Sequence, residues 1–143
     1  MGTRVLLVVA LLCVILAIIA VWQQFGGDPS VTVAPVDPAS PEATDLTAWA
    51  SKVRAAGTAA REKLVADRFH ADVPASRRQE LARRVVAHLV AAERPAPHAV
   101  RQSSQGGLVA TWKCTPGPGR AAELSLMFVR GADDRLELTG IMP

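Results

Sequence analysis

Three histidines and two cysteines are the side chains most able to do chemistry in this sequence. His70 lies two residues before Asp72, and His98 lies shortly before Ser103 and Ser104. A nucleophile and its base could be drawn from His98 and either serine, but such residues are common in loops and at strand edges. A metal site needs convergent ligands, and no two histidines have the four-residue spacing that places both on one helix face. The sequence therefore predicts no catalytic, metal-binding or cofactor-binding residue, and only a local hydrogen bond between His70 and Asp72.

The two cysteines cannot form a bridge within the chain, because Cys13 lies in an apolar run and Cys114 lies far along the C-terminal part. In an oxidising compartment a lone thiol can pair between chains, so Cys114 is a candidate intermolecular thiol. If it lies on the inward side with Trp112, it is instead a small, inert apolar side chain. The lack of a neighbouring base in the sequence favours the inert interpretation. His88 is expected at an interface, at the border of an apolar helix face.

Arginine side chains are predicted to gather on one face of a helix. Arg77, Arg83, Arg84 and Arg94 fall on the polar face of a predicted helix, opposite its apolar stripe. From residue 45 onward there are 15 basic and 10 acidic side chains, a net charge of +5, which suits anionic lipid, wall polymer or an acidic protein. Nucleic-acid binding would need a more concentrated basic face with aromatic rings on it. The four arginines are therefore a candidate face for an anionic partner, with an ordinary solvated face as the alternative.

The chain is organised around an apolar run from Val5 to Trp22, eighteen residues without a formal charge. As a helix rising about 1.5 Å per residue it would cover roughly 27 Å, close to the ~30 Å hydrocarbon thickness of a bilayer. We therefore predict a single-pass signal anchor within residues 1–25. Val5, Leu12, Ile15 and Trp22 are its membrane-contacting residues, and the lipid bilayer is its partner.

The charges that flank this run predict its orientation. Arg4 precedes the run, whereas Asp28, Asp37 and Glu42 follow it with no basic residue before residue 52. The positive-inside rule then leaves the N-terminus in the cytoplasm and the C-terminal domain outside the inner (cytoplasmic) membrane. The alternative is a signal peptide cleaved after Ala20, which would release a secreted or periplasmic soluble domain.

A spacer and one small domain are predicted after the anchor. Residues 26–40 are rich in proline and glycine, which favours an extended segment of roughly 40 Å. Residues 41–143 then form the domain. Ser40 and Pro41 have the residue types of a helix start. From there apolar residues recur at three- and four-residue steps to about residue 69, which predicts one continuous helix.

The sequence also makes predictions about a glycine in the first helix and about the start and end of the second helix. Gly57 lies on the apolar stripe of the first helix, where it would permit a close backbone crossing. Ser76 and Gln79 resemble a capping box, and the second helix would run from there to about Glu93, where prolines stop it.

The hydrophobic period changes from 3.6 to 2 after residue 98, which predicts an antiparallel meander of three or four strands with one apolar face. Val100–Ser104 would add a weak strand at an edge. Trp49 of the first helix is expected to contact Trp112 or Phe128. The residues expected to point inward are Leu108, Ala110, Trp112, Cys114, Leu124, Leu126, Phe128, Leu136 and Leu138.

Several larger apolar side chains fall on the opposite side of this sheet. These are Val109, Met127, Val129 and Ile141. An apolar patch there would indicate a protein contact, for example a homodimer.

The predicted fold class is α+β, with a transmembrane helix, a spacer and two helices packed on the meander. This element order, with the strand pair LSLMFVRGADDRLELTGI, is similar to small extracytoplasmic NTF2-like or cystatin-like domains, and no site residue is transferred from them. Arginine outnumbers lysine 13 to 3, which is typical of a GC-rich bacterial genome. We therefore expect a membrane-anchored, extracytoplasmic binding or scaffolding module of a bacterial envelope assembly, without catalysis. An enzyme of unknown class is the remaining alternative.

Overall fold

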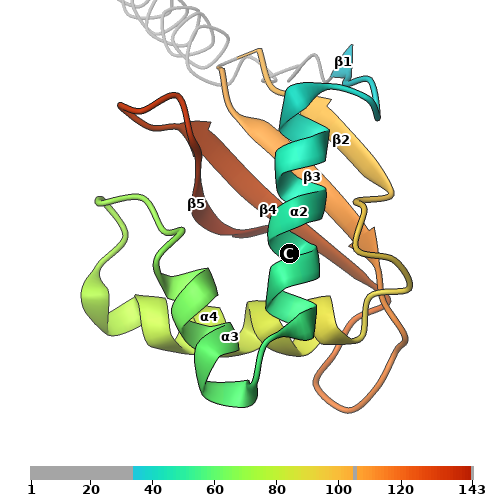
Figure 1. The fold of residues 1–143 in the computed structure, drawn as a ribbon, viewed down its shortest axis with the longest axis vertical. Coiled ribbons are helices and arrows are strands. Elements are labelled where there is room, and N and C mark those ends of the chain that lie inside the picture. The colour runs from blue at the N-terminus through green and yellow to red at the C-terminus, as the bar shows by residue number, and fades with distance from the viewer. Residues whose placement is uncertain (1–33, 105, 143) are drawn as a thin grey trace, which may run out of the picture. The chain divides into compact units, whose positions relative to one another are not determined.

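The computed structural model describes residues 34–104 and 106–142. The chain divides into two compact units, and all described residues belong to the second, Val31–Pro143. The predicted anchor Val5–Trp22 thus lies outside the described residues. Within the described part, no helix combines the length and the apolar character that crossing a bilayer requires. The second unit is an α+β fold in which three helices accompany a five-stranded antiparallel sheet (Figure 1).

The strands follow one another across the sheet in sequence order. They are β1 (Ala34–Pro35), β2 (Ala99–Gln102), β3 (Leu108–Lys113), β4 (Glu123–Arg130) and β5 (Leu136–Met142). The expectation of three or four strands was therefore too low. The additional strand, β1, lies within the segment predicted as a spacer, residues 26–40, and pairs with Arg101 and Gln102. Because β1 covers β2, the edges of the sheet are β1 and β5, and β2 is not the edge strand that the sequence predicted.

Three helices take the place of the two predicted: α2 (Pro41–Ala55), α3 (Thr58–Ala66) and α4 (Ala75–Val90). The continuous first helix was wrong because Ala56 and Gly57 are both extended, with ψ of 159° and 162°. Glycine lowers helix propensity, and the Arg61 side chain satisfies the end of α2 by donating to the carbonyls of Val53 and Arg54 at 3.1 and 2.9 Å. Gly57 is exposed, and apart from its chain neighbours no described residue has an atom within 4 Å of the position a Cβ would occupy. The predicted close crossing at Gly57 is therefore wrong.

The helix starts were predicted with mixed success. The Ser40 side chain accepts a hydrogen bond from the Ala43 amide at 3.2 Å, and Pro41 is the first helical residue, as predicted. The capping box at the start of α4 is wrong, because this helix begins after Pro74 and no side chain of the described residues caps it. It also ends at Val90, before the predicted end.

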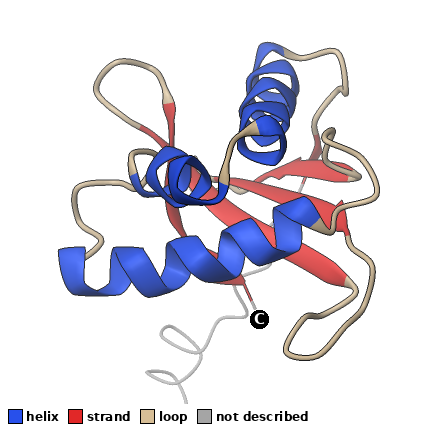
Figure 2. Ribbon diagram, turned by 60° about the horizontal axis from the view of Figure 1, so that its bottom comes forward, coloured by secondary structure: helices blue, strands red, loops and turns tan. Residues whose placement is uncertain are grey.

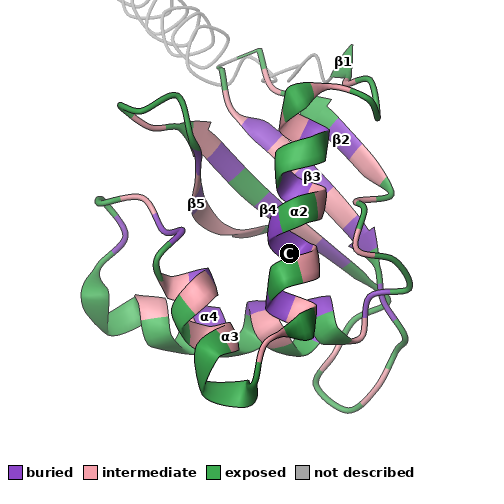
Figure 3. Cartoon of the chain, viewed as in Figure 1, coloured by how far each residue is buried: buried purple, intermediate pink, exposed green. Residues whose placement is uncertain are grey.

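The helices pack on one face of the sheet and enclose a single core (Figure 2). The predicted inward positions of β3, β4 and β5 are all buried, and buried residues mark the strands beneath α2 in Figure 3. The predicted aromatic contact is confirmed in both of its forms. The Trp49 ring meets Trp112 and Phe128 edge to face, with centroid distances of 6.5 and 6.0 Å.

Candidate functional site

A groove runs between the start of α4 and the exposed edge of the sheet. It has a volume of about 780 Å³. Its walls are the connection from α3 to α4, the first half of α4, and the ends of β4 and β5. Three features of the chain shape it: the partly covered edge of β5, a bulge in that strand, and the connection that His70 and Arg78 hold in place.

The edge of β5 is covered only in its first half. The Leu138 amide donates to the carbonyl of Arg68 at 2.8 Å, and the His70 amide donates to the carbonyl of Leu138 at 2.9 Å. This contact forms an isolated parallel bridge between Phe69 and Leu138. Beyond Leu138 no described segment hydrogen-bonds to the outer edge of β5. The uncovered half, Gly140–Met142, borders the groove.

A bulge changes which way the end of β5 faces. The register slips between Met127 and Phe128, and Thr139, with no partner of its own in the ladder, donates its hydroxyl to the Met127 carbonyl at 3.1 Å. Ile141 consequently pairs with the inward residue Leu126 and packs against the core. Its predicted outward position was therefore wrong.

The outward side of the sheet keeps a smaller apolar surface than the sequence predicted. Met127 and Met142 are exposed, at 42% and 40%, whereas Val109 and Val129 are half-buried. Met127 remains a candidate for a protein contact, and Met142, which the sequence did not predict, is exposed as well.

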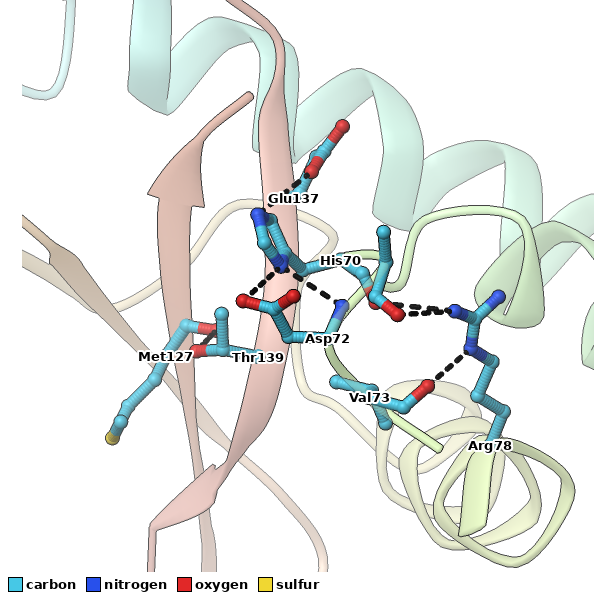
Figure 4. A network of polar contacts seen from close by, with 8 residues as sticks. His70, Asp72, Val73, Arg78, Met127, Glu137 and Thr139 are labelled. Atoms are coloured by element: carbon cyan, nitrogen blue, oxygen red, sulfur yellow. Dashed lines mark hydrogen bonds and ion pairs between the residues drawn. The ribbon is translucent and has the colours of Figure 1, made fainter. Parts of the chain in front are cut away.

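His70 lies between two carboxylates at one end of the groove (Figure 4). Its Nδ1 accepts a hydrogen bond from the Asp72 amide at 3.2 Å, so the local bond predicted for this pair is present, through the backbone. Its Nε2 faces Glu137 Oε2 at 3.6 Å. The Asp72 carboxylate lies 3.4 Å from Nδ1. These contacts hold the connection in place, and among the described residues no group of three ligands could hold a metal ion.

Glu137 was not identified from the sequence. It stands at an alternate position of the last strand, where an acid ordinarily faces solvent, and its neighbour His70 is 67 positions earlier in the chain. The contact depends on the parallel bridge between residues 69 and 138, which no local pattern predicts.

Arg78 fixes the rest of the connection (Figure 4). Its Nε donates to the Val73 carbonyl at 2.8 Å, and one terminal nitrogen reaches the carbonyls of His70 and Ala71 at 3.3 and 3.2 Å. The Arg78 guanidinium thus donates hydrogen bonds to three backbone carbonyls of the connection. Its positive charge is used to hold this wall of the groove together.

The predicted arginine face does not act as one surface. Arg77 and Arg84 both line the groove, are exposed, and have no hydrogen bond or ion pair from their side chains to any described residue. Arg83 points elsewhere, with Nε 3.7 Å from the Glu62 carboxylate. Arg94 follows the end of α4 and lines a separate pocket of about 300 Å³. Two of the four predicted residues are thus brought together.

Leu81 joins these two arginines on the same side of α4. Residues 77, 81 and 84 are separated by four and three positions, so they lie on one helix face, and all three line the groove. Arg130 also lines the groove, but it forms ion pairs with Glu42 and, at 2.9 Å, with Asp134. The two arginines that line the groove without an ion pair to a described residue are therefore both on α4.

The other residues that the sequence singled out for chemistry are either buried in the core or too far apart to act together. Cys114 is buried and donates its thiol to the His88 carbonyl at 3.3 Å, and burial raises the pKa of the thiol. His88 is itself buried, with Nδ1 2.7 Å from the Arg84 carbonyl. His98 and Ser103 lie at opposite ends of β2, roughly 16 Å apart along an extended chain, too far for a nucleophile and its base.

One buried cation was missed by the sequence analysis. Arg68 is 4% exposed, forms an ion pair with Asp45 and donates from Nε to the Leu136 carbonyl at 2.7 Å. Its guanidinium also lies over the Trp49 ring, 5.5 Å from the centroid. These contacts fasten the residues before His70 to the edge strand and so position the groove.

No family model, no curated protein and no solved structure matches this chain, so the groove and its side chains are the basis for any functional assignment.

Proposed function

We propose that this chain is a single-pass, membrane-anchored binding module whose folded domain lies outside the inner membrane and engages a protein partner of the bacterial envelope. The observation that carries the proposal is the groove beside α4, where Arg77 and Arg84 lie on either side of Leu81 and their side chains have no ion pair or hydrogen bond to any described residue. Exposed cations that flank an apolar side chain in a recess provide both affinity and selectivity for a partner of opposite charge.

The anchoring half of the proposal is supported by the run Val5–Trp22. Eighteen uncharged residues are long enough to cross the hydrocarbon core, and no other part of the sequence would place the chain at an envelope. The acidic residues after the run favour the orientation with the domain outside. Membrane anchoring and partner binding are separate claims, and they are tested separately.

The anchoring claim is tested by fractionation and N-terminal sequencing. The full-length chain should sediment with membranes, resist extraction by high salt, and retain its original N-terminus. A product that begins after Ala20 would favour the secreted or periplasmic alternative. A full-length, unprocessed product in the soluble fraction would refute the anchor.

The binding claim is tested by cross-linking in living cells. A photoreactive amino acid at position 81 should capture one defined envelope protein, whereas the same amino acid at position 101, on β2, should not. The Arg77→Glu/Arg84→Glu double variant should abolish the product at position 81. If the two positions capture the same proteins, or if charge reversal leaves capture unchanged, the groove is not a binding site.

The enzyme alternative makes a different prediction about the histidines and the thiol. If an activity resides in the groove, alanine at His70 should remove it, and alanine at His98 or Cys114 should not. For a binding module, all three alanine variants that remain folded should keep the cross-link from position 81.

A further inference from the structure

Building on the proposed function, we infer that the groove takes an extended acidic segment of a partner protein, which adds as a strand to the uncovered half of β5 and places carboxylates beside Arg77 and Arg84. Three observations support this inference: the unpaired strand edge, the spacing of side chains on α4, and the charge of the groove.

The uncovered part of β5 is a template for strand addition. Arg68 and His70 already use this edge, each through one backbone hydrogen bond to Leu138. From Gly140 to Met142 no described residue continues that pairing. An antiparallel or parallel partner strand could therefore extend the sheet here through main-chain hydrogen bonds.

The side chains on α4 repeat at a spacing that an extended peptide can match. Arg77 and Leu81 are separated by about 6 Å along the helix axis, and Leu81 and Arg84 by about 4.5 Å. Alternate side chains of a strand are roughly 6.6 Å apart and point the same way. A segment with acid, apolar and acid at positions i, i+2 and i+4 would therefore meet Arg77, Leu81 and Arg84, with the length of the arginine side chains absorbing the difference.

The charge balance of the groove selects an acidic segment. Arg130 is neutralised by Glu42 and Asp134, and Asp72 lies beside His70 at the end of the groove. Among the described residues, no acidic side chain forms an ion pair with Arg77 or Arg84, the two arginines of α4 that line the groove. Guanidinium groups bind carboxylates through paired hydrogen bonds, so each would gain a partner from the ligand.

A second copy of this chain fits less well. The free edge of one copy would present Gly140–Met142 to another, and this segment carries no acidic side chain. A lipid headgroup layer would satisfy the arginines, but it has no backbone to pair with Gly140–Met142. The extended acidic segment is the occupant that uses both features.

The test uses the full chain in phosphatidylcholine nanodiscs. The probe is a pool of fluorescent octapeptides with glutamate at positions 3 and 7, an apolar residue at position 5, and serine or threonine elsewhere. A matched pool carries lysine in place of glutamate. We expect the glutamate pool to bind at least tenfold more tightly than the lysine pool, and this preference to weaken as salt is added.

Two double variants distinguish binding in the groove from general attraction by the net charge of the protein. Arg77→Glu/Arg84→Glu should weaken binding of the glutamate pool at least tenfold. Arg94→Glu/Arg101→Glu makes the same change in net charge outside the groove and should leave binding within twofold. Equal binding of both pools, or equal loss in both double variants, would overturn the inference.

Strand addition is tested through the peptide backbone. The tightest glutamate peptide is N-methylated either at its odd or at its even amides. Because alternate amides of a strand face one neighbour, one of the two methylated peptides should lose binding and the other should keep it. Equal affinities would refute strand addition, while the cross-link from position 81 would still decide whether the domain is a binding module.

The membrane alternative has its own measurable outcome. If the arginines engage lipid, the α4 amides will gain protection from hydrogen exchange in phosphatidylglycerol nanodiscs, and the glutamate pool will fail to bind in phosphatidylcholine nanodiscs. That combination would replace the peptide with an anionic lipid surface.

Discussion

The ion pair of Arg68 with Asp45 gives an unusual stability prediction, because its two members differ in exposure. The Arg68 side chain is 4% exposed, whereas that of Asp45 is 47% exposed. Asp45→Asn leaves a buried guanidinium without its counter-charge, and breaking a buried pair from one side costs about 3 kcal/mol of unfolding free energy. Arg68→Met leaves a carboxylate that water can hydrate. Its main loss is the hydrogen bond to the Leu136 carbonyl, about 1 kcal/mol.

Removing the exposed partner should therefore destabilise the domain more than removing the buried one. For a domain of this size, 1 kcal/mol corresponds to about 4 °C in melting temperature, so the expected losses are about 12 °C for Asp45→Asn and about 4 °C for Arg68→Met. The double variant should resemble Arg68→Met alone, since the buried charge is then absent. The measurement is thermal unfolding of the full chain in nanodiscs, followed by the near-ultraviolet circular dichroism of Trp49 and Trp112.

The refuting result is a reversed order. If Asp45→Asn costs less than Arg68→Met, the guanidinium does not depend on Asp45 for compensation, and its contacts with Leu136 and Trp49 dominate. Additive losses in the double variant would likewise contradict the argument, because residues that share one buried charge must show coupling.

Two further predictions follow from the pKa shifts. The backbone hydrogen bond at the start of α2, with Arg130 contributing, holds the pKa of Glu42 below its ordinary value. Glu42 therefore stabilises the fold at neutral pH, and this contribution is lost as the pH falls through the folded-state pKa. The difference in melting temperature between the wild type and Glu42→Gln should have its largest value above about pH 5.5 and should disappear at lower pH. A difference that does not change with pH would contradict this prediction. In a Cys13→Ala background, Cys114 should react with a disulfide reagent at least 100-fold faster in the unfolded chain, because burial raises its pKa and denies access. Rapid formation of a disulfide-linked dimer by the folded chain would show instead that the thiol is intermolecular.

The sheet could be predicted from the sequence because its signal is local. Period-two alternation placed Leu126, Phe128 and Leu138 inward, and glycine- and proline-rich turns separated the strands. The contacts of Trp49 followed, since few large side chains were present to fill one core. What alternation could not supply was the strand β1, which is two residues long and is recruited by pairing with β2.

The break between α2 and α3 shows where local periodicity fails. The apolar stripe continues in sequence through Gly57, so the three- and four-residue steps look unbroken. Two extended residues change the phase of the following helix, in which Val65 is the buried residue. Gly57 itself was the available signal, because glycine within a helical pattern is a weak point.

The bulge in β5 had a similar signal. Gly140 interrupts the strand pattern, and an isolated glycine in a strand often marks a bulge. Counting one extra residue at this point would have moved Ile141 to the inward side. Arg68 and Glu137 carried no such signal, since their partners lie 23 and 67 positions away in the chain.

The groove combines these local and non-local features, which explains why only part of it was predicted. The face of α4 formed by Arg77, Leu81 and Arg84 follows from helix geometry, and the sequence identified its arginines. The opposite wall exists because the connection after Arg68 covers half of the β5 edge and then turns away into α4. Charge on one wall and unpaired backbone on the other are together the requirements of a surface that receives an extended acidic chain. A ligand that contacts only one of the two walls would leave either the arginines of α4 or the backbone groups of β5 without a partner from the ligand.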